Sequence, residues 1–268
     1  MIAKQILLLA NLPDSELFAE VSVGMQAALK NALALSHDAS FLLKSERKRA
    51  ADILFSIAEE EAAKVQILLD VVRCPKSGPA FAVQLKRFND HLAKGIYAKY
   101  SSTRPADIDE VARFVGDERD EYYLDGPEDI DWVFRNQILQ GREELFYVDY
   151  VATDDGCRWL EPMYEYGRMR LLLEPAAVNL AALFVRAGMD NPKSLELIAD
   201  KWRGVSFPAG THWQVCAQQN RETVVALHER SLLTEFGQKN VSRIIDEWLF
   251  PLWPLDLKTR RVEPGDLR

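Results

Sequence analysis

Apolar positions recur every three to four residues over long stretches of the chain, a spacing that predicts amphipathic helices. The first stretch runs from Asp14 to Lys44. The second, SERKRAADILFSIAEEEAAKVQILLDVV, is predicted to open with Ser45 as its N-cap and to stop at Pro75. A third helix is predicted over residues 80–101. Its inward face carries Phe81, Leu85, Phe88, Leu92 and Ile96. Three consecutive amphipathic helices with short joins indicate a helical bundle.

The pattern changes after this bundle. A helix is expected within DEVARFVGDERDEYY (109–123), and Gly126-Pro127 breaks it. Two β-rich runs then flank Asp154-Asp155-Gly156, which is typical of a β-hairpin. Helical patterns return from Met163, and the apolar, proline-punctuated run FPLWPLDL (250–257) predicts an extended strap laid on the body.

These elements predict a mainly α-helical bundle with a small β-hairpin insertion. No internal repeat or low-complexity linker divides the sequence, so we expect one domain over residues 1–268. Within it we place a core bundle at about 14–104, the hairpin at about 144–161 and a C-terminal helical part at about 163–250.

Composition narrows the class of protein. The chain has 268 residues, of which 48% are hydrophobic and 28% charged, as in ordinary globular proteins. A net charge of −8 argues against a surface coated all over for nucleic acid. Three cysteines without a CxxC spacing favour a reduced, cytoplasmic protein, and no apolar run is long enough to span a membrane.

Sequence motifs exclude most familiar enzyme classes. The histidines form no HExxH pattern, and the acidic segment 107–131 lacks the DxDxDG loop of calcium sites. There is no GxSxG elbow of the serine hydrolases and no GxGxxG or GxxxxGK[ST] phosphate loop. We therefore expect neither a metal nor a cofactor.

A basic segment lies within this acidic chain. Residues 73–104 carry seven Lys and Arg side chains against one acidic residue, Asp90, which indicates a phosphate-facing surface. On a continuous third helix, Arg87, His91 and Lys94 share one exposed stripe opposite the core. Arginine and histidine together can cleave RNA without metal, because imidazole moves protons and guanidinium holds phosphate. A solvated helix face produces the same pattern, so both interpretations stand.

The second helix carries charged residues within its apolar stripe. Glu61 and Lys64 fall inside the stripe and Glu60 on its edge, which is costly unless the charges are paired. One explanation is an intrahelical ion pair at a helix–helix seam. The other is a polar cluster between helices, joined by Asn31 of the first helix, that orients a site or a dimer contact.

Four motifs, taken in order, resemble the AbiV family of abortive-infection proteins, a branch of the HEPN-like helical superfamily. The family's "ALxNAxxLLxDAxxL", "EExGK", "FxxHxxKL" and "LYVDF…G.W..P" patterns are echoed between residues 24 and 185. The matching residues are Ala28, Asn31, Ala32, Asp38, Ala39; Glu60, Glu61, Lys64; Phe88, His91, Lys94; and Leu145, Tyr147, Val148, Asp149, Tyr150, Gly156, Trp159, Pro162. Ala63 stands where glycine is usual, and Gly95 where leucine is usual.

This resemblance implies a HEPN-like fold and a cytoplasmic bacterial antiphage protein that halts growth or translation after infection. Many HEPN proteins are metal-independent endoribonucleases that act as homodimers through an Arg-x4–6-His motif. In this version His91 is the general acid or base, Arg87 steadies the phosphate and Lys94 adds positive field. The supporting residues are Asn31, Glu60, Glu61 and Lys64. Only three residues separate Arg87 from His91, one short of the motif, and Lys86 has the right separation but the wrong side chain.

A second version of the function breaks no bond. Here the basic third helix, or the acidic surface of residues 107–131, docks a phage or ribosome-associated protein. The two charged faces serve equally well for self-association. The sequence leaves RNA cleavage and protein binding both open.

Overall fold

Helices make up most of the chain, as predicted. The computed structural model describes residues 5–125, 131–134, 136–153, 156–160 and 175–262. The longer helices are α1 (Asp14–Lys44), α2 (Lys48–Arg73), α3 (Pro79–Lys86), α4 (His91–Tyr100), α5 (Ile108–Arg119), α6 (Gln137–Phe146), α7 (Ala176–Arg186), α8 (Pro192–Trp202) and α9 (Trp213–Glu229). Shorter ones are η1 (Ile6–Asn11), η2 (Arg87–Asn89), α10 (Glu235–Lys239) and α11 (Val241–Glu247). The strands are β1 (Asp120–Asp125), β2 (Asp131–Phe134), β3 (Asp149–Thr153), β4 (Gly156–Leu160) and β5 (Arg260–Val262).

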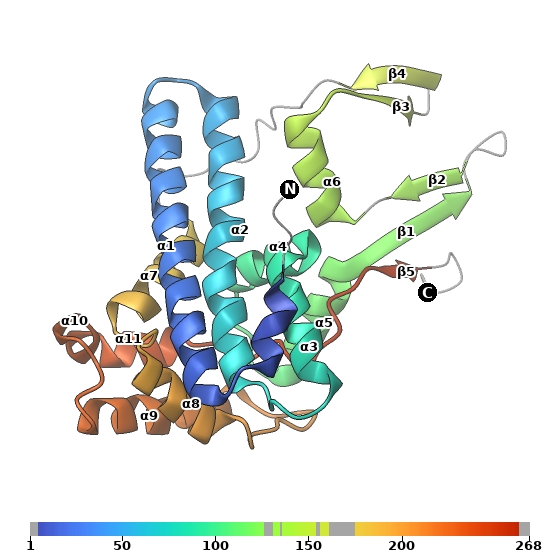
Figure 1. Cartoon of the computed structure of the whole chain (residues 1–268). Coiled ribbons are helices and arrows are strands. Elements are labelled where there is room, and N and C mark those ends of the chain that lie inside the picture. The colour runs from blue at the N-terminus through green and yellow to red at the C-terminus, as the bar shows by residue number, and fades with distance from the viewer. Residues whose placement is uncertain (1–4, 126–130, 135, 154–155, 161–174, 263–268) are drawn as a thin grey trace.

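The long helices α1 and α2 run side by side as an antiparallel hairpin, and its upper end projects beyond the helices packed at its lower end (Figure 1). The predicted bounds of α1 are confirmed. The N-cap predicted for α2 is wrong: Ser45 follows α1, and its Oγ donates a hydrogen bond to the Phe41 carbonyl at 3.0 Å. Glu46 then takes a positive φ of 58°, so α2 begins only at Lys48.

The third predicted helix is broken in two. α3 gives way to the 3₁₀ turn η2, and Asp90 leaves the helical region with φ −87° and ψ 122°. Its Oδ1 then accepts a hydrogen bond from the Ala93 amide at 3.0 Å and caps α4. Because the break falls between Arg87 and His91, helical periodicity does not place these two residues on one stripe.

Two pairs of strands follow the helices α5 and α6: β1 and β2 come after α5, and β3 and β4 come after α6. The predicted hairpin is confirmed, since β3 and β4 pair antiparallel from Asp149↔Leu160 to Thr153↔Gly156; the turn residues 154 and 155 lie outside the described residues. A second sheet was not predicted. It has the order β2-β1-β5, with β1 antiparallel to β2 and parallel to β5. The helix expected over 109–123 therefore ends at Arg119, where β1 begins.

The C-terminal part packs against the lower end of the α1–α2 hairpin, where α7 to α11 gather (Figure 1). Helical patterns predicted there are confirmed for α7, α8 and α9, whereas residues 161–174 lie outside the described residues. The strap is also present. Its side chains Phe250, Leu252 and Leu257 are at most 3% exposed, so it is part of the core. The boundaries of the single predicted domain stay a prediction.

Candidate functional site

A half-buried carboxylate, Glu60 of α2, contacts side chains from two other helices. Its Oε2 lies 2.8 Å from both Lys94 Nζ and His91 Nδ1, which come from α4. Its Oε1 accepts a hydrogen bond from Arg142 Nε of α6 at 3.1 Å. The Glu60 side chain is only 14% exposed. One carboxylate therefore connects α2, α4 and α6.

The charge state of Glu60 follows from these neighbours. Burial alone raises the pKa of a carboxyl group, because it disfavours the charged form. The hydrogen bond and the positive charge of Lys94, together with the hydrogen bond to His91, outweigh that effect and lower the pKa of Glu60 below its ordinary value. Glu60 is thus an anion at neutral pH, and its three partners share one negative charge.

His91 is oriented by this anion. Because Glu60 is ionised, we assign the proton of the 2.8 Å contact to His91 Nδ1, which leaves Nε2 of the neutral ring as an acceptor. The side chain is 44% exposed, so the ring is open to solvent. Lys94 Nζ lies 3.2 Å from the same Nδ1 and donates to Glu60. A carboxylate that fixes an imidazole tautomer is the arrangement that prepares a histidine for proton transfer.

The neighbouring residue, Glu61, faces the other way, toward α1. Asn31 Nδ2 donates a hydrogen bond to Glu61 Oε2 at 3.0 Å, and Lys64 pairs with Glu61 Oε1. Lys64 Nζ also lies 5.1 Å from the centroid of the Phe88 ring. Both explanations offered for these charges therefore hold in part: there is an intrahelical ion pair, and Asn31 joins it across the α1–α2 seam. The supporting role of the group in a site stays a prediction.

Arg87 and Lys94 do not lie on an exposed helix face, so that prediction is wrong. Arg87 is 5% exposed and Lys94 6%. Arg87 is covered by the strap, which lies far away in the sequence. Lys94 is covered because α2 and α6 pack on its side of α4. His91 is exposed as expected.

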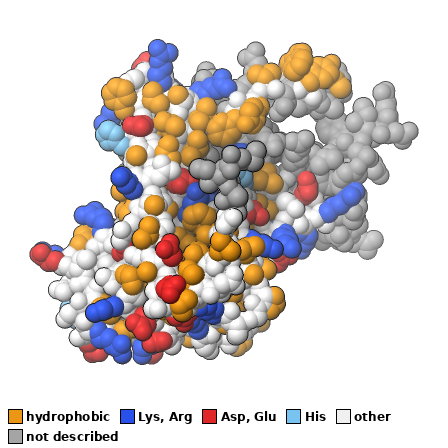
Figure 2. Space-filling model, in the orientation of Figure 1, with side chains coloured by type: hydrophobic (Ala, Val, Ile, Leu, Met, Phe, Trp, Pro, Cys, Tyr) orange, Lys and Arg blue, Asp and Glu red, His pale blue; other side chains and the backbone are white. Residues whose placement is uncertain are grey.

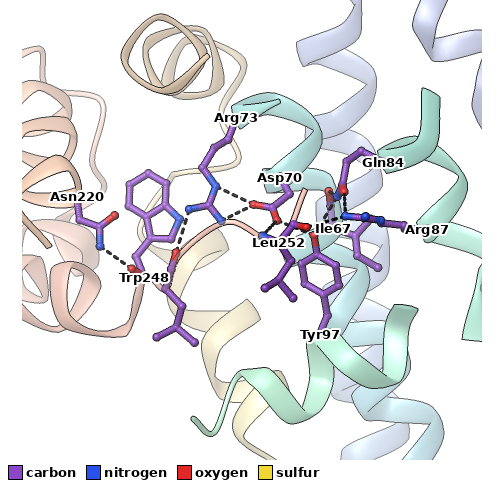
Figure 3. A network of polar contacts seen from close by, with 10 residues as sticks. Ile67, Asp70, Arg73, Gln84, Arg87, Tyr97, Asn220, Trp248 and Leu252 are labelled. Carbon is purple, nitrogen blue, oxygen red and sulfur yellow. Dashed lines mark hydrogen bonds and ion pairs between the residues drawn. The ribbon is translucent and has the colours of Figure 1, made fainter. Parts of the chain in front are cut away.

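The Arg87 guanidinium is used to hold the strap (Figure 3). It donates hydrogen bonds to Gln84 Oε1 at 2.8 Å, to the Leu252 carbonyl at 2.9 Å and to the Leu255 carbonyl. Within the described part of the chain, no hydrogen bond joins it to His91. Arg87 and His91 therefore do not form the predicted pair, and the Arg87 side chain instead binds the backbone of the strap.

Asp70 of α2 holds the same strap from the other side (Figure 3). Its Oδ2 accepts hydrogen bonds from the Tyr97 hydroxyl at 2.6 Å and the Leu252 amide at 2.8 Å, and its Oδ1 pairs with Arg73. Arg73 in turn donates to the Leu249 carbonyl at 3.1 Å and lies over the rings of Trp202 and Trp248. Asp70 and Arg73 are both buried and form an ion pair with each other.

Sequence reasoning missed Arg142. It lies in α6, a helix that was not predicted. Because Arg142 follows His91 by 51 positions, no local motif connects the two residues. A weak signal was available: Asn136 precedes the apolar pair Ile138 and Leu139, and its Oδ1 caps α6 by accepting from both of their amides.

Gly95 explains how α6 comes so close. A Cβ atom at this position of α4 would lie 2.3 Å from Ile138 Cγ2, so glycine is needed where the family pattern has leucine. Beside this contact, α2, α4 and α6 enclose a cleft of about 310 Å³. Glu60, Arg142 and Ala176 of α7 are all in its wall.

A comparison with models of known protein families shows to which family this chain belongs. The model of the AbiV family matches residues 20–167, more than half of the sequence. The chain belongs to the AbiV family. The HEPN-like fold class inferred from the motifs is thereby confirmed, and AbiV membership indicates a role in abortive-infection defence. No curated protein and no solved structure matches the chain.

The AbiV match contains the whole Glu60 cluster. It spans α2, α4 and α6, whereas the strap that binds Arg87 lies beyond its last matched residue, 167. In the described segments of this AbiV protein, no group of three His, Cys, Asp or Glu residues is placed to hold a metal ion. None of its described helices is both long and apolar enough to cross a membrane.

Proposed function

We propose that this AbiV-family protein acts in abortive infection as a metal-independent endoribonuclease, with His91 as its general acid or base. The observation that carries the proposal is the Glu60–His91 hydrogen bond. A half-buried anion holds Nδ1 at 2.8 Å, while the His91 side chain remains 44% exposed to solvent.

The chemistry needs only groups on this chain. His91 Nε2 takes the proton of an RNA 2′-hydroxyl, whose oxygen attacks the adjacent phosphorus; the bond from phosphorus to the 5′-oxygen breaks. The products are a 2′,3′-cyclic phosphate and a 5′-hydroxyl, and the leaving oxygen takes a proton from an imidazolium or from water. Lys94 adds positive field next to the ring, which favours the negative charge on the phosphate.

The residues behind the site position it. Asn31 and Lys64 hold Glu61, which fixes the α1–α2 seam one residue from Glu60. We further propose that the protein works in the cytoplasm as a homodimer that brings two such sites together. In this proposal Arg87 secures the strap, and it does not contact the substrate.

The first test is digestion of total cellular RNA by the purified protein in EDTA. We expect fragments that end in 2′,3′-cyclic phosphate, because the attacking group is the 2′-hydroxyl. A His91→Ala variant serves as the control that the activity belongs to this site. If the wild-type protein leaves RNA intact, or cuts only when a divalent metal is present, the proposed mechanism is wrong.

One feature favours binding of a protein partner as the second candidate function. Large apolar side chains are exposed around the end of α6 and the β3–β4 hairpin: Tyr147, Val148, Tyr150 and Trp159. The Tyr150 and Trp159 side chains are 61% and 69% exposed, and their ring centroids lie 5.0 Å apart. Figure 2 shows hydrophobic side chains gathered at this end of the molecule. Exposed aromatic clusters are typical of binding surfaces.

A Tyr150→Ser/Trp159→Ser double variant tests this second candidate. Loss of an aromatic anchor costs about 2 kcal/mol or more at an interface, so partner affinity should fall ~30-fold and phage protection with it. RNA cleavage by the purified variant should be unchanged. Val215→Ser, at an exposed position of α9, is the matched control. A double variant that is folded and protects cells as well as wild type would argue against a docking surface on the hairpin.

A further inference from the structure

Phosphodiester cleavage at His91 requires a cation that holds the phosphate, and Arg87 is committed to the strap. We infer that Arg142 is this phosphate-binding residue, and that the cleft between α2, α4 and α6 holds the nucleotide next to the cleaved bond. This inference rests on the proposed ribonuclease function and assigns a substrate-binding subsite to it.

The geometry places Arg142 beside His91 through a shared anchor. Glu60 binds His91 with Oε2 and Arg142 with Oε1, so the two side chains lie on either side of one carboxylate. Among the described residues, Arg142 uses only Nε for hydrogen bonding to protein. Its side chain is 32% exposed at the cleft. The two Nη groups form the flat fork that binds two phosphate oxygens at once.

The cleft suits a nucleotide in size and chemistry. Its volume of about 310 Å³ lies at the lower end of the range for small-molecule sites. The wall offers the hydroxyls of Ser56 and Ser102 and the amide of Gln137, which can bond to a sugar or a base. Gly95 and Gly141 keep part of the wall free of side chains.

Charge decides where the phosphate lies. With His91 neutral, Glu60 is outnumbered by Lys94 and Arg142, so this group carries a net positive charge that a phosphodiester neutralises. Elsewhere in the wall, Glu59 is acidic, and Lys99 is already paired with Glu118 at 2.6 Å. The phosphate therefore belongs at the Arg142 end, next to His91, and the nucleoside in the remainder of the cleft.

Binding of a labelled 2′-O-methyl oligoribonucleotide tests the inference, since this probe cannot be cut by 2′-hydroxyl attack. Fluorescence anisotropy is measured for the wild type, Arg142→Ala, Arg142→Lys and Arg221→Ala. The last removes the same charge from an exposed position of α9, outside the cleft. We expect Arg142→Ala to weaken binding ~10-fold or more and to lower the salt dependence by about one phosphate contact. Arg142→Lys should restore part of the affinity, and Arg221→Ala should bind as wild type does.

Cleavage by the same variants separates this inference from the proposed function. We expect Arg142→Ala to lower kcat/KM on cleavable RNA by ~10²-fold. If the wild type cuts RNA and folded Arg142→Ala binds and cuts as well as Arg221→Ala, the inference is overturned while the ribonuclease stands. If the wild type binds the probe through Arg142 but never cuts RNA, the subsite stands and the ribonuclease falls. A wild type that does neither overturns both.

Discussion

Replacement of His91 by alanine is expected to lower RNA cleavage by ~10²–10⁴-fold, because general acid–base catalysis by a positioned side chain contributes about that much. The free energy of unfolding should change by about 1 kcal/mol or less, since the side chain is 44% exposed. Single-turnover cleavage of a short RNA measures the first quantity, and a urea denaturation curve measures the second. A folded His91→Ala protein that cuts RNA at the wild-type rate would remove His91 from the mechanism.

Glu60→Gln is the companion variant for His91. It keeps the size of the side chain but removes the anion that fixes the imidazole, so cleavage should also fall. In the wild-type protein, the direction of the pKa shift of Glu60 fixes how this residue's contribution to stability depends on pH. Because the folded pKa of Glu60 lies below its unfolded value of 4.5, the stability it contributes is present above that value and is lost as pH falls through the folded pKa.

Replacement of Asp70 by alanine is expected to destabilise the protein by ~3–5 kcal/mol, the cost of leaving a buried charge without its partner. Asp70 is fully buried, and Arg73, which would remain, is 5% exposed. The Tyr97 hydroxyl and the Leu252 amide would lose their acceptor as well. Since domains are stable by only ~5–15 kcal/mol, the variant should unfold at markedly lower urea concentration.

Two further variants test the cause of that loss. Asp70→Asn retains an acceptor oxygen without the charge, so its stability should lie between those of wild type and Asp70→Ala. Lys239→Ala removes the exposed Glu235–Lys239 pair on α10 and should change the unfolding free energy by less than about 1 kcal/mol. If Asp70→Ala is as stable as Lys239→Ala, the buried network does not hold the strap in the way described.

Local patterns predicted the helices that have one continuous apolar face. The stripe of α1 ends where the helix ends. Of the five predicted inward residues of the third helix, Phe81, Leu85, Leu92 and Ile96 are buried, whereas Phe88 is half-buried against the core. The break between α3 and α4 was missed because the apolar spacing continues across it. Asp90, which caps α4, is a local mark of the break. β5 was missed because it pairs with β1, a strand about 140 positions earlier.

The site was predicted in part, for a related reason. Glu60, Glu61 and Lys64 stood out because charge on an apolar stripe demands partners, and Asn31 is one of those partners. Arg87 was placed wrongly because the strap that covers it is remote in sequence, and burial by a remote segment leaves no periodic trace. Arg142 was not found because its link to His91 exists only after α6 has packed against Gly95.

The strap also has a consequence for how the protein is made. Asp70, Arg73 and Arg87 are synthesised long before residues 249–257, whose backbone amide and carbonyl groups they bind. In a nascent chain that has reached only α9, these three side chains can pair with Tyr97, Gln84 and one another, but they lack their backbone partners in residues 249–257. Completion of this core has to wait for the later segment to leave the ribosome. Translation itself thus times when the helices around His91 reach their final stability.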